Sequence, residues 1–200
     1  MILTNKLSKK ITNFIISNTT TTEENIELID YGLKIIISNT FKIIILFVTA
    51  YIFNVLSYTV VALFCFGFIR MSASGTHANS TITCIIVNYI FFLGNVLFSI
   101  NFQFNFYELI LIFIINLIIL IKYSPADTKK RPLVSKKLRL KLKIYSIISL
   151  ILLFIFSLFL NNSIYKTIIS ISNLEAAIST TPLMYNFFKN SYRNYDNIPL

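Results

Sequence analysis

The chain contains a single histidine, His77, and a cysteine, Cys84, follows it seven residues later. Both residues stand in a polar stretch of mainly small side chains, 70–84, between long apolar runs. An imidazole beside a thiol supplies the general base and the nucleophile of a cysteine hydrolase. We therefore expect any covalent chemistry of this chain to take place in this stretch.

The spacing of His77 and Cys84 limits how they can meet. In one regular helix, seven residues at about 1.5 Å each would separate the side chains by roughly two turns, too far for a hydrogen bond. The histidine must therefore lie outside the helix and fold back. Gly75 permits a tight or left-handed turn, and Asn79 or Ser80 can cap a helix that carries the cysteine. A helix N-terminus and a neighbouring imidazolium both favour a thiolate.

A structural interpretation of these residues stays open. A lone histidine in a polar turn is often interfacial, and a cysteine in an apolar segment is often only a small hydrophobe. Cys65, between two phenylalanines, is interpreted as a packing residue. No disulfide framework or metal cluster is indicated, so we expect reduced thiols, no metal and no cofactor. A non-enzymatic small permease or a structural membrane protein is the alternative class of function.

The elements that position these residues follow from composition. Hydrophobic residues make up 56% of the 200 residues, charged residues make up 13%, and the mean hydropathy is +0.73. A soluble core of this size cannot bury so much apolar surface. The sequence predicts an all-α, polytopic helical membrane protein with about four to six membrane segments, one of them bent or re-entrant, plus N-terminal amphipathic helices. The net charge of +10 then fits cytoplasmic loops facing membrane lipids better than nucleic acid.

Five apolar tracts are long enough to be membrane segments, because a bilayer core needs roughly 20 residues of helix. They cover residues 43–69, 82–100, 104–121, 144–160 and a more polar tract, 164–185. A single crossing by 43–69 would place the basic N-terminus outside the cell. Asn54 and its polar neighbours near the middle of that tract suit a break, so a bent or re-entrant segment is favoured over an inverted N-terminus.

The residues before these tracts are predicted to form a separate region, 1–42, of amphipathic interfacial helices, followed by a polytopic membrane domain, 43–200. Residues 2–15 place apolar side chains at helical spacing between lysines, which is typical of a helix lying on an anionic membrane surface. Thr21 and Glu24 can form a capping box that begins a second helix. These helices either only anchor the N-terminus or also hold a partner peptide.

The segment 122–143 sets the orientation. It contains nine cations and a single acid, Asp127, so we expect it in the cytoplasm. Counting back from this loop places His77 and Cys84 at the cytoplasmic face of the cell membrane. Asp127, Asn79 and Ser80 are the candidate residues for orienting the imidazole.

Three separated stretches together resemble the accessory gene regulator B family, AgrB. They are Arg70 to Cys84 with Gly75 and His77, Tyr123 to Pro132, and Leu174-Glu175-Ala176 followed by Pro182. The resemblance implies a membrane cysteine endopeptidase of Gram-positive quorum sensing. Such an enzyme removes the C-terminal segment of a propeptide, AgrD, and contributes to a cyclic thiolactone or lactone signal. The family's catalytic histidine and cysteine fall on His77 and Cys84. Arg70 and Gly75, in the same stretch, are candidate supporting residues.

The resemblance also bears on substrate binding. AgrD-like propeptides tend to have acidic C-terminal segments, which Lys129, Lys130 and Arg131 can hold, although these cations can equally be only a topology signal. An acid at the depth of Glu175 is costly unless it faces a polar cavity or a partner, so we expect it to line the site. A short interfacial helix would remove that cost and stays open. A homodimer is the remaining candidate for a protein partner.

Overall fold

The computed structural model describes residues 10–11, 23–78, 80–129 and 132–197. Within these ranges the regular elements are helical, which confirms the predicted all-α fold class. The predicted helix over residues 2–15 lies almost entirely outside the described residues. The chain divides into two compact units, 1–52 and 53–200, and each is described by itself.

The described part of the first unit is dominated by one long helix, α2, Glu23–Ile52. The predicted second amphipathic helix forms its beginning, and the first part of the tract 43–69 forms its end. Within α2, the segment Gly32–Ile52 is long and apolar enough to cross a membrane. One helix thus serves as both the amphipathic helix and a candidate span.

The break predicted in the tract 43–69 lies at residues 53–55, between α2 and α3, Leu56–Ala73. Asn54 has a φ of 55°, in the left-handed region that asparagine tolerates better than most residues. In place of a bent or re-entrant segment, the structure has two helices, each long enough to cross a membrane.

The second unit contains the remaining helices. They are α4, Thr81–Asn88, the π-helix η1, Tyr89–Gly94, α5, Asn95–Asn101, α6, Phe106–Tyr123, α7, Lys136–Phe159, α8, Ser163–Ile178, α9, Pro182–Phe187, and the 3-10 helix η2, Asn194–Asn197. Over the whole described chain, five helical segments can cross a membrane by length and composition, in agreement with the predicted polytopic architecture. The first turns of α7 take up the second part of the predicted basic loop 122–143.

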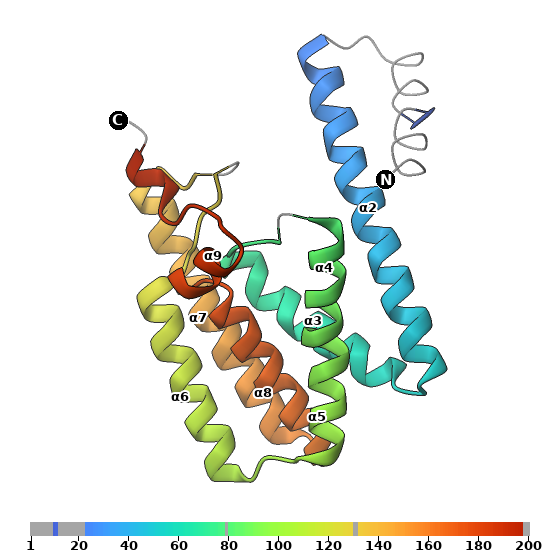
Figure 1. Cartoon of the computed structure of the whole chain (residues 1–200). Helices are drawn as coiled ribbons and strands as arrows, with labels where there is room; N and C mark the ends of the chain where they lie inside the picture. The colour runs from blue at the N-terminus through green and yellow to red at the C-terminus, as the bar shows by residue number, and fades with distance from the viewer. Residues whose placement is uncertain (1–9, 12–22, 79, 130–131, 198–200) are drawn as a thin grey trace. The chain divides into compact units, whose positions relative to one another are not determined.

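Helix α8 lies at the centre of the second unit. It contacts α3, α5, α6 and α7, and Figure 1 shows it between α6 and α5. Half of its residues are buried, including Thr167, Ser172 and Asn173. Although it is too short to count among the candidate spans, its burial argues against a peripheral interfacial helix.

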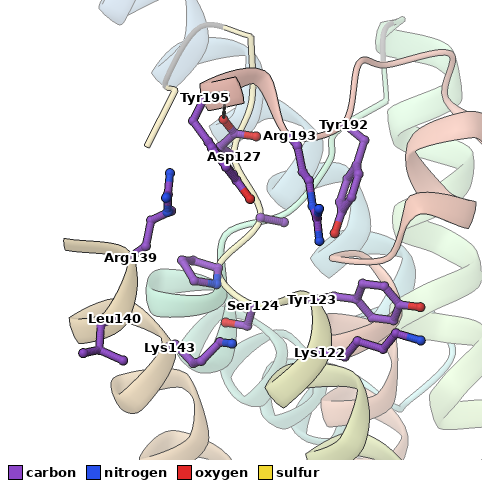
Figure 2. Close-up of a pocket in the computed structure, with 12 residues that line it drawn as sticks. Lys122, Tyr123, Ser124, Asp127, Arg139, Leu140, Lys143, Tyr192, Arg193 and Tyr195 are labelled. Carbon is purple, nitrogen blue, oxygen red and sulfur yellow. Dashed lines mark hydrogen bonds between the residues drawn. The ribbon is translucent and has the colours of Figure 1, made fainter. Parts of the chain in front are cut away.

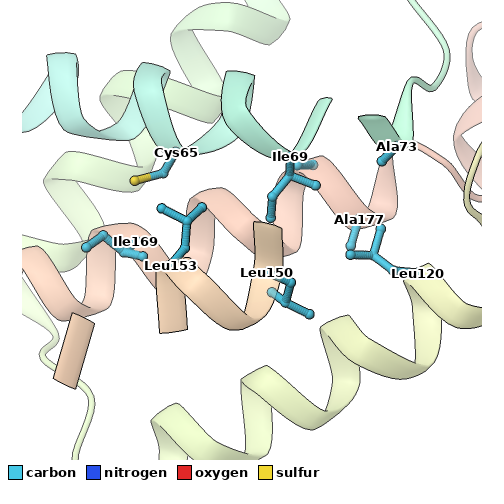
Figure 3. Close-up of a cluster of buried hydrophobic side chains, with 9 residues drawn as sticks. Cys65, Ile69, Ala73, Leu120, Leu150, Leu153, Ile169 and Ala177 are labelled. Carbon is cyan, nitrogen blue, oxygen red and sulfur yellow. The ribbon is translucent and has the colours of Figure 1, made fainter. Parts of the chain in front are cut away.

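The core joins α3, α6, α7 and α8 (Figure 3). It consists of apolar and small side chains, namely Cys65, Ile69, Ala73, Leu120, Leu150, Leu153, Ile169, Ala176 and Ala177. The three alanines let helices approach closely, as is common in membrane bundles. Cys65 is 2% exposed, which confirms it as a packing residue. The outward faces of the same helices carry many exposed large aliphatic side chains, as lipid contact requires.

Candidate functional site

The loop after α3 begins with a turn that only glycine adopts easily. Gly75 has a φ of +121°, and it follows Ser74, whose φ is 58°. An added Cβ at Gly75 would lie 2.6 Å from an Arg70 guanidinium nitrogen and 2.8 Å from the Ser179 carbonyl oxygen. The chain therefore needs glycine here both for the backbone angle and for the close approach of its neighbours.

Arg70, in the last turn of α3, holds this loop together. Its guanidinium donates to the carbonyl oxygens of Thr76, at 3.0 Å, and Gly75, at 3.3 Å, and to the Ser179 hydroxyl at 2.5 Å. It also contacts Nε2 of His77 at 3.2 Å. Because a guanidinium has no acceptor, this contact is a hydrogen bond only when the facing ring nitrogen is unprotonated. Nδ1 of the same ring lies 3.5 Å from the same guanidinium nitrogen, so Arg70 fixes the position of the imidazole beside the loop.

The residues that follow α8 also hold the loop in place. The backbone N–H of Thr76 donates to the Ser179 carbonyl at 3.1 Å. The side-chain amide of Asn190 donates to the Thr76 hydroxyl at 2.6 Å and to the His77 carbonyl at 2.8 Å. The loop backbone at His77 is therefore fixed by residues from distant parts of the sequence.

Cys84 lies near the beginning of the next helix, as its spacing from His77 predicts. Ser80 is the N-cap of α4, and its hydroxyl accepts from the Thr83 N–H at 3.1 Å. Asn79, the other predicted cap, lies outside the described residues. The Cys84 N–H donates to the Ser80 carbonyl at 3.0 Å, so the cysteine follows directly after the cap turn, and it is half-buried. The histidine is thus on the loop and the cysteine on the helix.

A pocket of about 390 Å³ adjoins the loop. It is lined by Gly67, Arg70, Met71, Ser74, Gly75, His77, Ala126, Asp127, Thr128 and Leu133. His77 is exposed beside it, whereas Cys84 is not among these lining residues. Its far wall is the segment 126–128, which an Ala126 N–H to Ala73 carbonyl bond of 3.0 Å ties to the end of α3. The pocket therefore lies directly next to the imidazole.

Asp127, a predicted orienter of the imidazole, contacts a different element. One carboxylate oxygen accepts from the Asn194 backbone N–H at 3.0 Å, and the other accepts from the Tyr195 N–H at 2.8 Å. Its backbone carbonyl accepts from the buried Tyr185 hydroxyl, whose pKa is raised chiefly by burial. Asp127 therefore joins the segment 124–128 to the residues around η2.

The predicted substrate-binding residues are dispersed. Lys129 is exposed, and Lys130 and Arg131 lie outside the described residues. Glu175 lies in α8, and its carbonyl accepts from the Ser179 N–H at 3.1 Å, so its backbone supports the base of the site. Its side chain is within the helical unit, where Oε2 is buried without a hydrogen-bond partner. The structure thus places Arg70, Gly75 and His77 together, with Asp127 lining the same pocket, whereas Lys129 and Glu175 do not line it.

Thr76, Ser179 and Asn190 were not predicted from the sequence. The polar run Ser179 to Thr181 before Pro182 indicates the end of a helix, but no spacing connects it with Arg70. Asn190 is one of several asparagines in a polar segment and carries no signal of its own.

Comparison with known proteins covers most of the chain. A family model described as accessory gene regulator B matches residues 8–180. A putative AgrB-like protein of Clostridium acetobutylicum is 37% identical over 174 residues, which is 86% of this chain and 83% of the relative. Accessory gene regulator protein B of Staphylococcus aureus strain Newman is 31% identical over 154 residues, 77% of this chain and 80% of the relative.

A putative AgrB-like protein of Listeria innocua is 31% identical over 175 residues, 87% of this chain and 85% of the relative. None of the solved structures is a significant match to this fold. The family match includes α3, the loop that carries His77, the helix that carries Cys84, and α8. With agreement over these elements and over most of the length of each relative, the chain belongs to the accessory gene regulator B family.

Proposed function

We propose that this chain is a membrane cysteine endopeptidase that cuts the C-terminal segment from a quorum-sensing propeptide of the AgrD type. The observation that carries the proposal is the setting of His77. Its ring faces the Arg70 guanidinium, on a loop fixed by Asn190, immediately before the capped helix that contains Cys84. Membership in the accessory gene regulator B family supports the same assignment.

The chemistry uses a proton acceptor and a nucleophile from the chain itself. His77 takes the proton of the Cys84 thiol, and Sγ attacks the carbonyl carbon of the scissile bond. The carbon–nitrogen bond then breaks, and the proton passes from His77 to the departing amine. This leaves the N-terminal part of the substrate on Cys84 as a thioester.

A hydroxyl or thiol within the substrate completes the reaction. It attacks the thioester carbonyl and gives its proton to His77, which returns it to the released Cys84. The product is a cyclic lactone or thiolactone, and no redox partner is needed. The negative charge on the attacked carbonyl oxygen needs N–H donors. The first N–H groups of α4, at Thr81 and Ile82, are the candidates, because the initial N–H groups of a helix have no acceptor inside it.

Substrate recognition draws on the cations near the site. Lys129, Lys130 and Arg131 are proposed to contact an acidic segment of the propeptide, and Glu175 to line the site from α8. The side of the membrane on which the site lies is inferred from the basic segment 122–143, because a segment so rich in Lys and Arg stays in the cytoplasm. The imidazole and thiol would therefore act at the cytoplasmic face of the cell membrane.

Coexpression with a propeptide followed by mass spectrometry tests the proposal. Cys84→Ala and His77→Ala should each abolish cleavage in a correctly inserted protein, because removing either member of such a pair disables both. Cys65→Ala is the matched control, since Cys65 is a buried core residue, and this variant should still cleave. Cleavage by Cys84→Ala at the wild-type rate would refute the enzymatic proposal.

Thiol labelling separates the enzyme from a non-enzymatic membrane protein. Near neutral pH, Cys84 should react with an alkylating agent much faster than Cys65, and His77→Ala should reduce this difference. Slow labelling of Cys84 that does not depend on His77 would favour a permease or structural protein.

A further inference from the structure

A second pocket, of about 270 Å³, adjoins the segment 124–127 (Figure 2). It is lined by Lys122, Tyr123, Ser124, Pro125, Ala126, Asp127, Arg139, Leu140, Lys143, Tyr192, Arg193 and Tyr195. The side chains come from the end of α6, the first turns of α7 and the residues that precede and begin η2. It shares Ala126 and Asp127 with the pocket beside His77.

The charge of this pocket favours an anion. Lys122, Arg139, Lys143 and Arg193 supply four cations, and Asp127 supplies the one carboxylate among the lining residues. Both oxygens of that carboxylate already accept backbone N–H groups. With four cations and one carboxylate, the pocket has an excess of positive charge that can attract an anionic ligand.

Part of this charge is held in position. The Arg139 guanidinium lies 3.9 Å from the centre of the Tyr195 ring and donates to the Leu133 carbonyl at 3.0 Å. Lys143 is half-buried in the second turn of α7. Prepositioned cations bind an anion at a smaller entropic cost than free surface lysines.

The surroundings of the pocket indicate what kind of anion it takes. Lys122 and Tyr123 are the last two residues of the candidate span Phe106–Tyr123, so the pocket lies at the level where a span leaves the bilayer. Leu140 lines the pocket and is 61% exposed, and Ile144, one turn further along α7, is 47% exposed. A cationic pocket beside an exposed aliphatic surface at this depth matches an amphiphile.

We propose that this basic pocket binds the phosphate-bearing headgroup of an anionic phospholipid, with the acyl chains along Leu140 and Ile144. Basic pockets between transmembrane helices on the cytoplasmic side suit such headgroups. An acidic peptide would satisfy the cations but would leave the adjoining aliphatic surface unused. Because the bound headgroup would bridge α6, α7 and Arg193, it would also brace the segment 124–128, which forms one wall of the His77 pocket. The inference does not depend on peptide cleavage.

Spin-labelled lipids test the proposal with the full chain in phosphatidylcholine vesicles. Electron spin resonance measures the association of labelled phosphatidylglycerol relative to labelled phosphatidylcholine. The pocket variant is Lys122→Gln with Lys143→Gln. The matched control is Lys136→Gln with Lys137→Gln, which removes the same charge from exposed residues of α7 that do not line the pocket.

We expect wild type and the control variant to prefer phosphatidylglycerol, and the pocket variant to lose roughly tenfold of that preference. An equal loss in both variants would show general surface attraction and overturn the proposal. Displacement of the lipid by millimolar inorganic phosphate would identify a free anion as the ligand and would also overturn it. So would a lack of lipid preference in wild type combined with protection of the pocket by an acidic peptide.

The cleavage-deficient Cys84→Ala variant keeps failure of this inference separate from failure of the proposed function. Cys84 does not line the basic pocket, so this variant should bind phosphatidylglycerol as wild type does. Loss of the lipid preference in Cys84→Ala would contradict the assignment of the headgroup to this pocket.

Discussion

Gly75→Ala is the most informative single substitution, because it changes one methyl group where the loop has no room for it. Gly75 has a φ of +121°, a conformation that costs other residues about 1–3 kcal/mol. The new Cβ would also lie 2.6 Å from an Arg70 guanidinium nitrogen and 2.9 Å from the Ser179 hydroxyl oxygen. Both distances are shorter than carbon makes in folded proteins, so the Arg70 to Ser179 hydrogen bond must open.

The expected cost is local. Losing a hydrogen bond from a charged donor costs about 1.5–3 kcal/mol, so with the backbone strain the loop is destabilised by roughly 2.5–6 kcal/mol. A loss of this size lowers the fraction of molecules with the loop in its native conformation by a factor of about 100 or more. Gly75 is not a member of the core cluster of α3, α6, α7 and α8, so the helical unit should keep its thermal stability.

The assay combines propeptide cleavage, followed by mass spectrometry, with the melting temperature in detergent. Gly75→Ala should lower cleavage at least about a hundredfold and leave the melting temperature nearly unchanged. Gly32→Ala is the matched control. Gly32 is inside α2 with no atom within 4 Å of an added Cβ, so this change should be neutral or slightly stabilising.

Gly67→Ala tests whether an added methyl group in the His77 pocket reduces cleavage when it causes no steric clash. Gly67 lines the His77 pocket, yet an added Cβ there has no neighbour within 4 Å. We expect near-normal cleavage from this variant. Wild-type cleavage by Gly75→Ala, or equal losses in Gly67→Ala and Gly75→Ala, would refute the reasoning that the geometry of this turn builds the site.

Three further predictions follow from the same contacts. Asn190→Ala should reduce cleavage about tenfold, because two hydrogen bonds to the loop are lost, whereas the exposed Asn186→Ala should not; equal rates in the two variants would contradict the role of Asn190. Asp127→Ala should expose the segment around residues 188–197 to limited proteolysis, because the Asn194 and Tyr195 N–H groups lose their acceptor; an unchanged digestion pattern would oppose this. The orientation can be tested with single cysteines in a background where Cys65 and Cys84 are replaced by alanine. In intact cells, Ser135→Cys should be shielded from an impermeant thiol reagent and Gln103→Cys should be labelled; labelling of Ser135→Cys from outside would reverse the assigned orientation.

The fold was predictable where it depends on hydrophobic length. Four of the predicted apolar tracts correspond to candidate spans, whereas 164–185 is interrupted where α8 ends at Ile178. The polar residues around Asn54 mark a real break. What the tract 43–69 could not disclose is that its first part continues the preceding helix, so that two candidate spans replace one bent segment. Hydropathy alone does not distinguish a bend within one span from a turn between two.

The candidate site was predictable where its geometry is local. The turn at Gly75 and the cap at Ser80 follow from residue types within a few positions of His77. The contacts of Ser179 and Asn190 could not be predicted, because they cross 109 to 114 residues and leave no periodic pattern. The same holds for the basic pocket, where Arg193 joins cations that the sequence alone groups with one continuous loop.

The long reach of these hydrogen bonds has a consequence for the order of synthesis. Arg70, Thr76 and His77 leave the ribosome 109 to 114 residues before the serine and asparagine that fix their loop. A nascent chain that has already inserted its histidine and cysteine therefore lacks a braced loop until the helix α8 and the residues up to Asn190 have been translated and packed. A chain released early, for example after Phe188, would contain both reactive side chains. It would still lack the two hydrogen bonds from Asn190 that fix the loop carrying His77.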